Sequence, residues 1–353
     1  MTAYVRNAWY VAAWSHEIEA GTPFPVSILD EPIVIYRGES GRMVALEDRC
    51  VHRLAPLSLG RCEGDRLRCM YHGLLYDPDG AVAEIPGQDL IPKNARVKTY
   101  PVADRHDWIW VWMGDPALAD LALIPPAVGL SNPDYILGHG HLDYAAEAQL
   151  INDNLLDFSH LTYVHANSFG AGPEFAQSLP KLEPLERGVR YSRWMVGTHG
   201  QSSRKSAVPI DSYMIYDFLI PGVLLMWSGN YPHGTAERLE FAAPALEDAA
   251  AGVTFTSQAV TPLGPKQSRY FFSWGPRRGH GDEALRDSLM ELAGVAFGED
   301  KTMIEAQQKV IDRSPGARIM PTAHDKGVTI FTRLVERLAK AETSAAVLPE
   351  KVA

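Results

Sequence analysis

The sequence predicts an α+β protein with two domains: an all-β N-terminal domain and a larger domain in which an antiparallel sheet packs against long helices. Three observations lead to this prediction. A chain of 353 residues is too long for one small hydrophobic core. Short strand-like runs closed by turns fill its first third, whereas longer strands and then helical patterns fill the rest. The pattern changes after Gly114-Asp115-Pro116, so we predict domains at residues 1–118 and 119–353.

The N-terminal domain begins with an apolar segment, residues 4–14, that is interrupted by Arg6 and is far shorter than a membrane span. The segment lacks the cationic leader and cleavage site of a signal peptide, so we expect it to be packed and the protein to be cytoplasmic. Strands are predicted where β-branched and aromatic residues run between turns, at residues 25–29, 33–37, 43–46 and 108–112. The alternating tryptophans of the last strand suit core packing, the commoner role, or an electron relay.

The second domain follows a proline-rich connector. Helical spacing predicts one helix over residues 147–164. Strands are predicted next, at residues 191–196, 212–219, 223–227, 253–260 and 269–274. Helices then follow at residues 282–296, 300–311 and 328–341. Glycine-rich and polar stretches at residues 167–178 and 198–209 are predicted to be loops, either ordinary surface loops or a lid, and the alanine-rich residues 242–251 a solvated loop.

Composition restricts the classes of function. A formal net charge of −10, with no long run of lysine or arginine, argues against nucleic acid or an anionic membrane as a partner. Three cysteines in a chain of this length cannot form a disulfide framework, and thiols that must stay reduced belong in a reducing compartment. Two of the cysteines lie in a metal-ligand pattern, and we expect the third, Cys62, to be an ordinary thiol.

The most specific chemical pattern is Cys50-Val51-His52, followed after sixteen residues by Cys69-Met70-Tyr71-His72. Each loop offers one thiolate and one imidazole, so together they supply two sulfur ligands for one iron and two nitrogen ligands for another. This is the ligand set of a Rieske [2Fe-2S] cluster, in which neutral imidazoles raise the reduction potential. A Cys2His2 zinc site is the alternative, but such sites group cysteine with cysteine and histidine with histidine. Here the two types alternate.

A second group of potential ligands lies in residues 153–165, which contain two histidines and two carboxylates. Two histidines and one carboxylate leave open positions on a mononuclear ferrous iron, which can then bind dioxygen beside a substrate. His160 and His165 lie roughly 140° apart on an ideal helix and cannot bind one ion without distortion. We therefore predict a kink, a widened turn or a helix end between them. Histidines satisfied in a core are the alternative, which the upstream cluster motif disfavours.

With both motifs established, the chain resembles the oxygenase component of Rieske non-heme iron aromatic-ring oxygenases, specifically the vanillate and dicamba O-demethylase branch. The resemblance covers nearly the whole chain. It rests on the two Cys-His loops, the Asp153-x3-Asp157-x2-His160-x4-His165 stretch, Glu299-Asp300-Lys301 and Glu305-Ala306-Gln307-Gln308. It implies an N-terminal Rieske domain, a C-terminal helix-grip (START-like) catalytic domain and a head-to-tail homotrimer.

The resemblance also implies the site residues. A [2Fe-2S] cluster would be bound by Cys50, His52, Cys69 and His72, and a mononuclear Fe(II) by His160, His165 and Asp300. Asn154 would lie just outside the iron. Asp157 would join the two metal sites by accepting hydrogen bonds from His72 of one subunit and His160 of the next, which is a short path for electrons. The alternatives are Asp153 or Glu299 as the carboxylate ligand, a helix-capping role for Asp300, and an Asp157 that only orients His160.

The function implied is that of a multicomponent monooxygenase of aromatic catabolism. With O2 and two electrons it would convert a methoxylated, vanillate-like aromatic to a phenol and formaldehyde. The chain has no flavin or nucleotide motif, so electrons from NAD(P)H would arrive through a separate ferredoxin or reductase. The alternatives are hydroxylation of an aryl methyl group or of the ring, and a Rieske electron carrier without oxygenase activity. The candidate substrate contacts are Leu219, Ile220, Leu224, Met226, Gln258 and Glu291, and Arg193 or Arg269 could meet a carboxylate.

Overall fold

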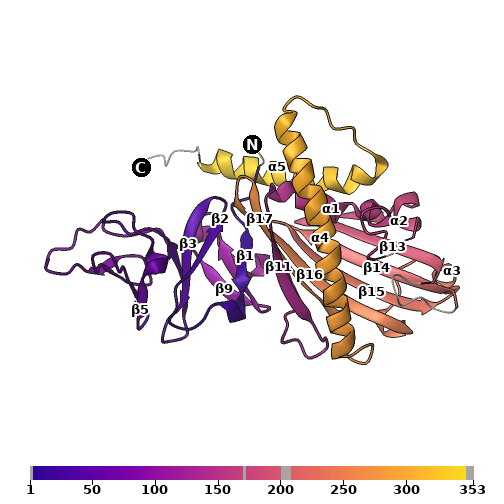
Figure 1. The fold of residues 1–353 in the computed structure, drawn as a ribbon, viewed down its shortest axis with the longest axis horizontal. Coiled ribbons are helices and arrows are strands. Elements are labelled where there is room, and N and C mark those ends of the chain that lie inside the picture. The colour runs from indigo at the N-terminus through magenta and orange to yellow at the C-terminus, as the bar shows by residue number, and fades with distance from the viewer. Residues whose placement is uncertain (1–2, 170–171, 200–207, 347–353) are drawn as a thin grey trace. The chain divides into compact units, whose positions relative to one another are not determined.

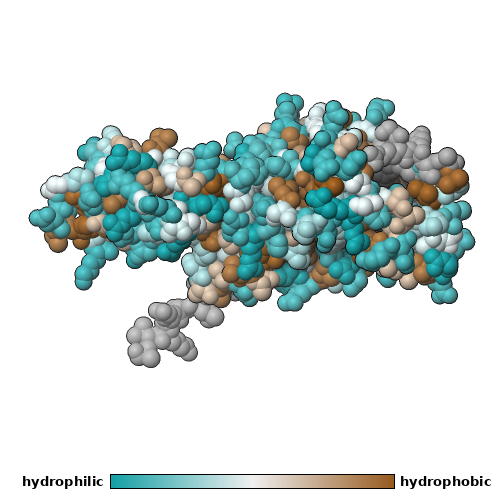
Figure 2. Space-filling model, turned by 90° about the horizontal axis from the view of Figure 1, so that it is seen from below, coloured by the Kyte–Doolittle hydropathy of each residue, from teal (hydrophilic) through white to brown (hydrophobic). Residues whose placement is uncertain are grey.

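The computed structural model describes residues 3–169, 172–199 and 208–346. Its internal contacts divide the chain into two compact units. One unit holds residues 6–125 together with residues 261–265, and the other holds residues 1–5, 126–260 and 266–353. The predicted boundary between residues 118 and 119 stays a prediction. Among the described residues, no helix is long and apolar enough to cross a membrane. Hydrophilic side chains cover most of the face in Figure 2, with apolar ones scattered among them.

Three small sheets build the N-terminal unit, as the all-β prediction requires (Figure 1). The first has the order β1 (Trp9–Trp14), β10 (Trp108–Trp112) and β9 (Val102–Arg105). The second has the order β2 (Phe24–Ile28), β3 (Glu31–Arg37) and β4 (Met43–Glu47). The third has the order β5 (Arg61–Glu63), β6 (Arg66–Arg68), β7 (Leu75–Tyr76) and β8 (Val82–Glu84). The four predicted strands are confirmed.

The tryptophans of β1 and β10 occupy facing positions of this antiparallel pair and are buried in the core of the unit. Trp108, Trp110 and Trp112 are at most 1% exposed, which confirms the core-packing interpretation. Trp9 lies edge-on to Trp112, with ring centroids 5.5 Å apart. Aromatic residues on facing positions of an antiparallel pair bury large areas, so these strands anchor the unit.

A seven-stranded sheet forms the second unit and confirms the predicted α+β class. Its order is β11 (Gly138–Tyr144), β17 (Gln267–Pro276), β16 (Ala251–Gly264), β15 (Val223–Pro232), β14 (Ile210–Leu219), β13 (Gly188–Thr198) and β12 (Lys181–Leu185). The five predicted strands are confirmed. β11 and β12 were missed because these edge strands are rich in glycine, histidine, lysine and proline, which are poor strand signals.

One long helix, α4 (Glu283–Arg313), crosses the sheet in front of its strands (Figure 1). The prediction of two helices broken near residue 298 was wrong. Gly298 stays helical because the buried face of α4 runs through it, with Ala296, Phe297, Asp300 and Ile304 all buried. On β11, a side chain at Gly138 would collide with Met290, so glycine lets α4 approach the sheet closely.

Shorter helices complete this unit. They are α1 (Ala148–Leu156), α2 (Glu174–Gln177), α3 (Thr235–Arg238) and α5 (Lys326–Ala346), the last confirming the predicted C-terminal helix. The described residues of the two units also form the 3-10 helices η1 (Ser15–Glu17), η2 (Leu57–Leu59), η3 (Pro116–Leu118), η4 (Leu121–Leu123), η5 (Phe158–Thr162), η6 (Leu246–Asp248) and η7 (Ala323–Asp325). Of the two predicted long loops, residues 167–178 contain α2, and most of residues 198–209 lies outside the described residues.

Candidate metal centres

The two Cys-His loops have the same backbone design. The first loop lies between β4 and η2, and the second lies between β6 and β7. Leu54 N donates to Cys50 O at 2.9 Å, and Gly73 N donates to Cys69 O at 3.0 Å. In both loops the cysteine N–H also donates to the carbonyl oxygen five residues later, at 2.8 Å. Leu54 and Gly73 both have a positive φ, of 58° and 79°, which explains the glycine in the second loop.

These loops place like ligands together. Cys50 and Cys69 are 2% and 1% exposed, and burial, together with a hydrogen bond to Cys50, raises the pKa of the Cys69 thiol. The rings of His52 and His72 lie at the surface with their centroids 4.5 Å apart. Two buried sulfurs beside two exposed imidazoles fit a two-iron cluster with a different ligand pair on each iron.

Tyr76 is a cluster residue that the sequence did not reveal. Its hydroxyl donates to Cys50 Sγ at 3.1 Å and accepts from Val51 N at 3.0 Å. A hydrogen bond to a ligand sulfur stabilises extra negative charge there and raises the reduction potential. No spacing rule would have found it, because it follows the second loop on an ordinary strand.

The histidines of the second constellation follow the end of a helix. α1 stops at Leu156, and Asp157, with φ −131° and ψ 94°, leaves the helical region. Asp157 Oδ1 then accepts from Ser159 N at 2.8 Å and caps η5, which ends at Thr162. The predicted α-helix to residue 164 is therefore wrong, whereas the predicted helix end between His160 and His165 is confirmed.

His160, His165 and Asp300 meet at one point, with their potential ligand atoms all within 4.8 Å of one another. Asp300 Oδ1 lies 3.5 Å from His160 Nε2 and 3.3 Å from His165 Nε2. Two ligands about 2.1 Å from one ion and roughly 90–110° apart lie about 3.0–3.4 Å from each other. The arrangement therefore fits a two-histidine, one-carboxylate iron site. Asp300 lies inside α4, so the alternative that it caps a helix was wrong.

Hydrogen bonds on the far side of each ring orient the two histidines. His160 Nδ1 lies 2.5 Å from the main-chain oxygen of Asp157, and His165 Nδ1 lies 2.8 Å from Glu299 Oε2. Nε2 of each ring is thereby left for a metal. Burial lowers the pKa of His160, which favours the neutral ring. Burial acts the same way on His165, but Asp300 and Glu299 outweigh it and raise the pKa of that ring.

Of the other predicted site residues, Asn154 and Glu299 contact this group, whereas Asp153 bonds elsewhere. Asn154 Nδ2 donates to Asp300 Oδ1 at 3.1 Å and lies 3.4 Å from His160 Nε2. The group of potential metal ligands around His160 contains neither Asp153 nor Glu299. Asp153 instead accepts from Gln149 Nε2 at 2.6 Å, and burial raises its pKa to about 6.

Asp153 predicts a pH-dependent stability. Its folded pKa of about 6 exceeds the ordinary 3.8, so the ionised form opposes folding. This cost is absent below pH 3.8, grows up to about pH 6, and reaches at most about 3 kcal/mol above it. Asp153→Asn should therefore raise the melting temperature at pH 8 but leave it nearly unchanged at pH 4. Equal effects at the two pH values would contradict the assigned cause, and a loss of iron would favour Asp153 as a ligand.

A cavity opens beside the three ligands, with about 620 Å³ of empty space that is partly open to solvent. Besides Asn154 and the three ligands, its lining is mostly apolar: Leu155, Phe158, Leu161, Phe169, Met214, Met226, Thr256, Gln258, Trp274 and Phe297. Of the predicted substrate contacts, Met226 and Gln258 line it. Leu219, Ile220 and Leu224 do not, because they lie at the β14–β15 turn, and Glu291 is exposed on α4.

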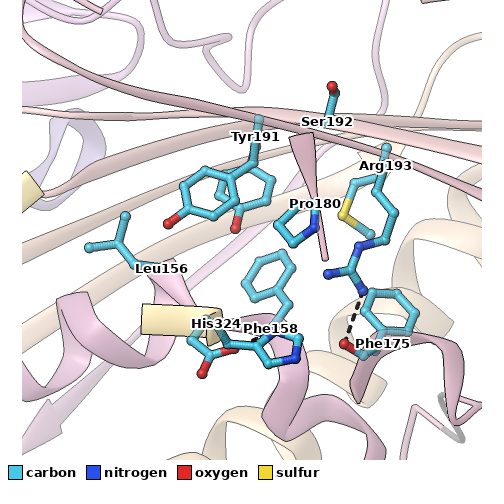
Figure 3. A pocket seen from close by; sticks show the side chains of 11 residues that line it. Leu156, Phe158, Phe175, Pro180, Tyr191, Ser192, Arg193 and His324 are labelled. Atoms are coloured by element: carbon cyan, nitrogen blue, oxygen red, sulfur yellow. Dashed lines mark hydrogen bonds and ion pairs between the residues drawn. The ribbon is translucent and has the colours of Figure 1, made fainter. Parts of the chain in front are cut away.

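A second, smaller cavity lies against Asp157 and shares only Phe158 and Met214 with the first. Figure 3 shows Arg193 reaching toward Phe175, whose main-chain oxygen accepts from Nη1 at 3.1 Å. His324 Nδ1 lies 3.9 Å from Asp157 Oδ1. The expectation that the Asp157 carboxylate accepts from His160 was wrong, because its main-chain oxygen occupies that position while Oδ1 caps η5.

The Vanillate O-demethylase oxygenase C-terminal domain family matches residues 144–341, and the Rieske [2Fe-2S] domain family matches residues 8–101. The chain belongs to the vanillate O-demethylase family of Rieske oxygenases. It is the oxygenase component of a non-heme iron monooxygenase, with a [2Fe-2S] cluster and an iron as cofactors. A separate protein of the system supplies its electrons. The zinc-site and electron-carrier alternatives are thereby excluded.

Members of the family align with this chain over nearly its whole length. One is TsaM1, the iron-sulfur subunit of the toluene-4-sulfonate monooxygenase system of Comamonas testosteroni. It is 39% identical to this chain, and the alignment covers 96% of this chain and 98% of TsaM1. The vanillate O-demethylase oxygenase subunit of Pseudomonas sp. (strain HR199 / DSM 7063) is 34% identical over 97% of both chains. The crystal structure of dicamba monooxygenase bound to 3,6-dichlorosalicylic acid has a TM-score of 0.87 and 28% identity, covering 97% of this chain and 100% of that one.

Within this oxygenase, Glu299 is expected to control how tightly His165 holds iron. Glu299 Oε2 accepts from His165 Nδ1 at 2.8 Å and from Ser168 Oγ at 2.6 Å, which fixes both the ring and the carboxylate. Glu299→Ala should weaken mononuclear iron binding by about 10- to 100-fold, and Glu299→Gln less, because the amide oxygen can still accept. Iron retention against a chelator measures this, with Ser168→Ala as the milder comparison. Parental retention in Glu299→Ala would contradict the role.

Proposed function

We propose that this oxygenase O-demethylates a methoxylated aromatic compound to a phenol and formaldehyde. The observation that supports this most is the apolar, aromatic-walled cavity directly beside His160, His165 and Asp300. Phe158, Phe169, Trp274 and Phe297 provide flat surfaces for an aromatic ring and keep water away from the reacting carbon. Iron held by the three ligands supplies dioxygen chemistry at one edge of that cavity.

The overall reaction balances with two electrons. A methoxyarene, O2, two electrons and two protons give water and a hydroxymethoxy arene, in which one oxygen atom has entered a methyl C–H bond. That hemiacetal breaks its carbon–oxygen bond to give the phenol and formaldehyde. The residues of the chain choose the carbon, since a misplacement of about 1 Å costs on the order of 100-fold in rate. Asn154, bonded to Asp300, holds the carboxylate ligand in place.

A second candidate is hydroxylation of an aryl methyl group. It is favoured by the 39% identity to a subunit of a toluene-4-sulfonate monooxygenase, against 34% for the vanillate enzyme. Product analysis decides between the two. Stoichiometric formaldehyde with loss of a methoxy group supports O-demethylation, whereas a benzylic alcohol or a ring diol without formaldehyde contradicts it.

For electron delivery we propose a ferredoxin or reductase partner and a head-to-tail homotrimer in the cytoplasm. Support comes from the exposed His52 and His72, and from the exposed apolar side chains of Leu54, Met70 and Tyr71 around them, which suit an interface. A surface histidine of the cluster can then approach Asp157 of a neighbouring subunit.

Mixed oligomers test the trimer. A chain with His72→Ala and a chain with Asp300→Ala are each expected to be inactive. Reassembled together, they should regain activity, because an intact cluster of one chain then faces an intact iron site of the other. Absence of any recovery, with mixed assembly verified by tags, would contradict electron transfer between subunits.

A further inference from the structure

We propose that the cavity beside His160 and His165 selects an uncharged aromatic substrate whose ring substituent both donates and accepts hydrogen bonds, such as a phenolic hydroxyl or a carboxamide, through Gln258 and Trp274. The proposal rests on the proposed function and narrows its substrate class. Three features of the cavity lead to it: two polar groups without partners, the absence of a cation, and the charge balance around the iron ligands.

Two buried polar atoms in the cavity lining have no hydrogen-bond partner among the described residues: Gln258 Oε1 and Trp274 Nε1. Gln258 is 5% exposed, and its Nε2 donates to Thr256 Oγ1 at 3.2 Å, so its oxygen is the atom left over. An indole N–H can only donate. Buried polar groups are almost always paired, so the missing partners of one acceptor and one donor point to a ligand.

These two residues lie on neighbouring strands, Gln258 on β16 and Trp274 on β17. Both side chains line the same cavity, where neighbouring side chains of adjacent strands are within reach of a single small substituent. A hydroxyl group satisfies such a pair, because it donates to the amide oxygen and accepts from the indole. A carboxylate or sulfonate can only accept and would leave Gln258 Oε1 facing a negative charge.

The described lining of the cavity offers no positive side chain to pair with an anion. Within the described part of the chain, its lining contains no lysine or arginine. Arg193 lines the neighbouring cavity instead, where it is bonded to Phe175 O and lies 5.0 Å from the centre of that ring (Figure 3). An anion buried without a partner is costly, so the lining favours a neutral substrate.

Iron itself does not supply the missing charge. A ferrous ion contributes two positive charges, and the ion must be included in the balance. Asp300 lies against both histidines, and Glu299 is bonded to His165, so two carboxylates offset the ion. The site is then close to neutral, and a substrate carboxylate or sulfonate would add an uncompensated charge.

Binding of matched ligands to the full-length, iron-loaded protein tests this class. The three methoxyphenols and the three methoxybenzoates are compared by calorimetry at pH 7.5, with methoxybenzamides and methoxybenzenesulfonates as further members. The best phenol or amide should bind at least about 10-fold more tightly than the best anion. An anion that binds as tightly or more tightly overturns the proposal.

Variants separate recognition from general packing. Gln258→Leu and Trp274→Phe should each weaken binding of the best phenol by about 10-fold, but leave binding of anisole, which has no hydroxyl, unchanged. Trp227→Phe is the matched control, because Trp227 packs on Phe255 outside the cavity lining. Equal losses for phenol and anisole would mean that the two residues only fill space, and would contradict the proposal.

Experiments can contradict the proposed substrate class without contradicting the proposed reaction, and the reverse. If cresols bind better than toluates but no methoxylated compound releases formaldehyde, the neutral class stands and O-demethylation does not. If formaldehyde forms only from methoxybenzoates, O-demethylation stands and the neutral class is overturned.

Discussion

Replacing Asp300 with alanine is expected to remove the mononuclear iron and leave the [2Fe-2S] cluster in place. Asp300 is 6% exposed and, among the residues that the structure describes, is the one carboxylate near Nε2 of both histidines. Loss of a partner to a ligand typically weakens metal binding by about 10- to 100-fold, so loss of a ligand should cost more. Turnover should therefore fall by more than about 100-fold.

Metal analysis measures this directly. The ratio of iron to acid-labile sulfide should fall to that of the cluster alone, while the visible spectrum of the cluster is unchanged. Asp153→Ala is the matched control, since Asp153 is a partly buried acid that contacts Gln149 and not the histidines. If Asp300→Ala kept its full iron while Asp153→Ala lost it, the ligand assignment would be wrong.

Asp157→Asn is expected to keep both metals and the fold and yet to reduce turnover by at least about 10- to 100-fold. An asparagine side chain can still accept from Ser159 N, so η5 keeps its cap, and the main-chain oxygen that orients His160 is unchanged. The negative charge and the second acceptor oxygen are lost. The proposed path then lacks the carboxylate that would accept a hydrogen bond from His72 of a neighbouring subunit.

Two rates distinguish this role from a merely structural one. Reduction of the cluster by its donor should proceed at the parental rate, whereas reoxidation of the cluster in the presence of substrate and O2 should be slow. Asp157→Ala, which also removes the cap, should lose stability in addition. Parental turnover in Asp157→Asn would end the bridging proposal.

Much of the site could be read from spacing because it is local. The four cluster ligands lie in two loops, and the iron histidines lie five residues apart. The distortion predicted between His160 and His165 follows from helical geometry alone, and η5 does end between the two histidines, at Thr162. The tryptophan alternation of β10 likewise predicted a strand, because a period of two puts side chains on alternate faces.

Helix boundaries were less predictable. Helices were predicted at residues 282–296 and 300–311, but the packed face of α4 keeps one helix continuous through Gly298, since burial outweighs the modest helix penalty of one glycine. Asp157 fitted a helical pattern, yet it ends α1 by capping the next turn. In both places a local propensity competed with contacts that the sequence pattern does not show.

The sequence by itself indicated the Cys-His pair of each cluster loop and the two iron histidines, because covalent spacing confines the donors of each loop or turn to a few ångströms. Only the tertiary structure decided which of several acids stands beside the histidines. α4 places Asp300 beside His160 and His165 and places Glu299 against Nδ1 of His165. Asp153 instead contacts Gln149. Only the tertiary structure brings Gln258, Trp274 and the apolar side chains together around one cavity, because pairing in the sheet, and not nearness in sequence, places their strands side by side.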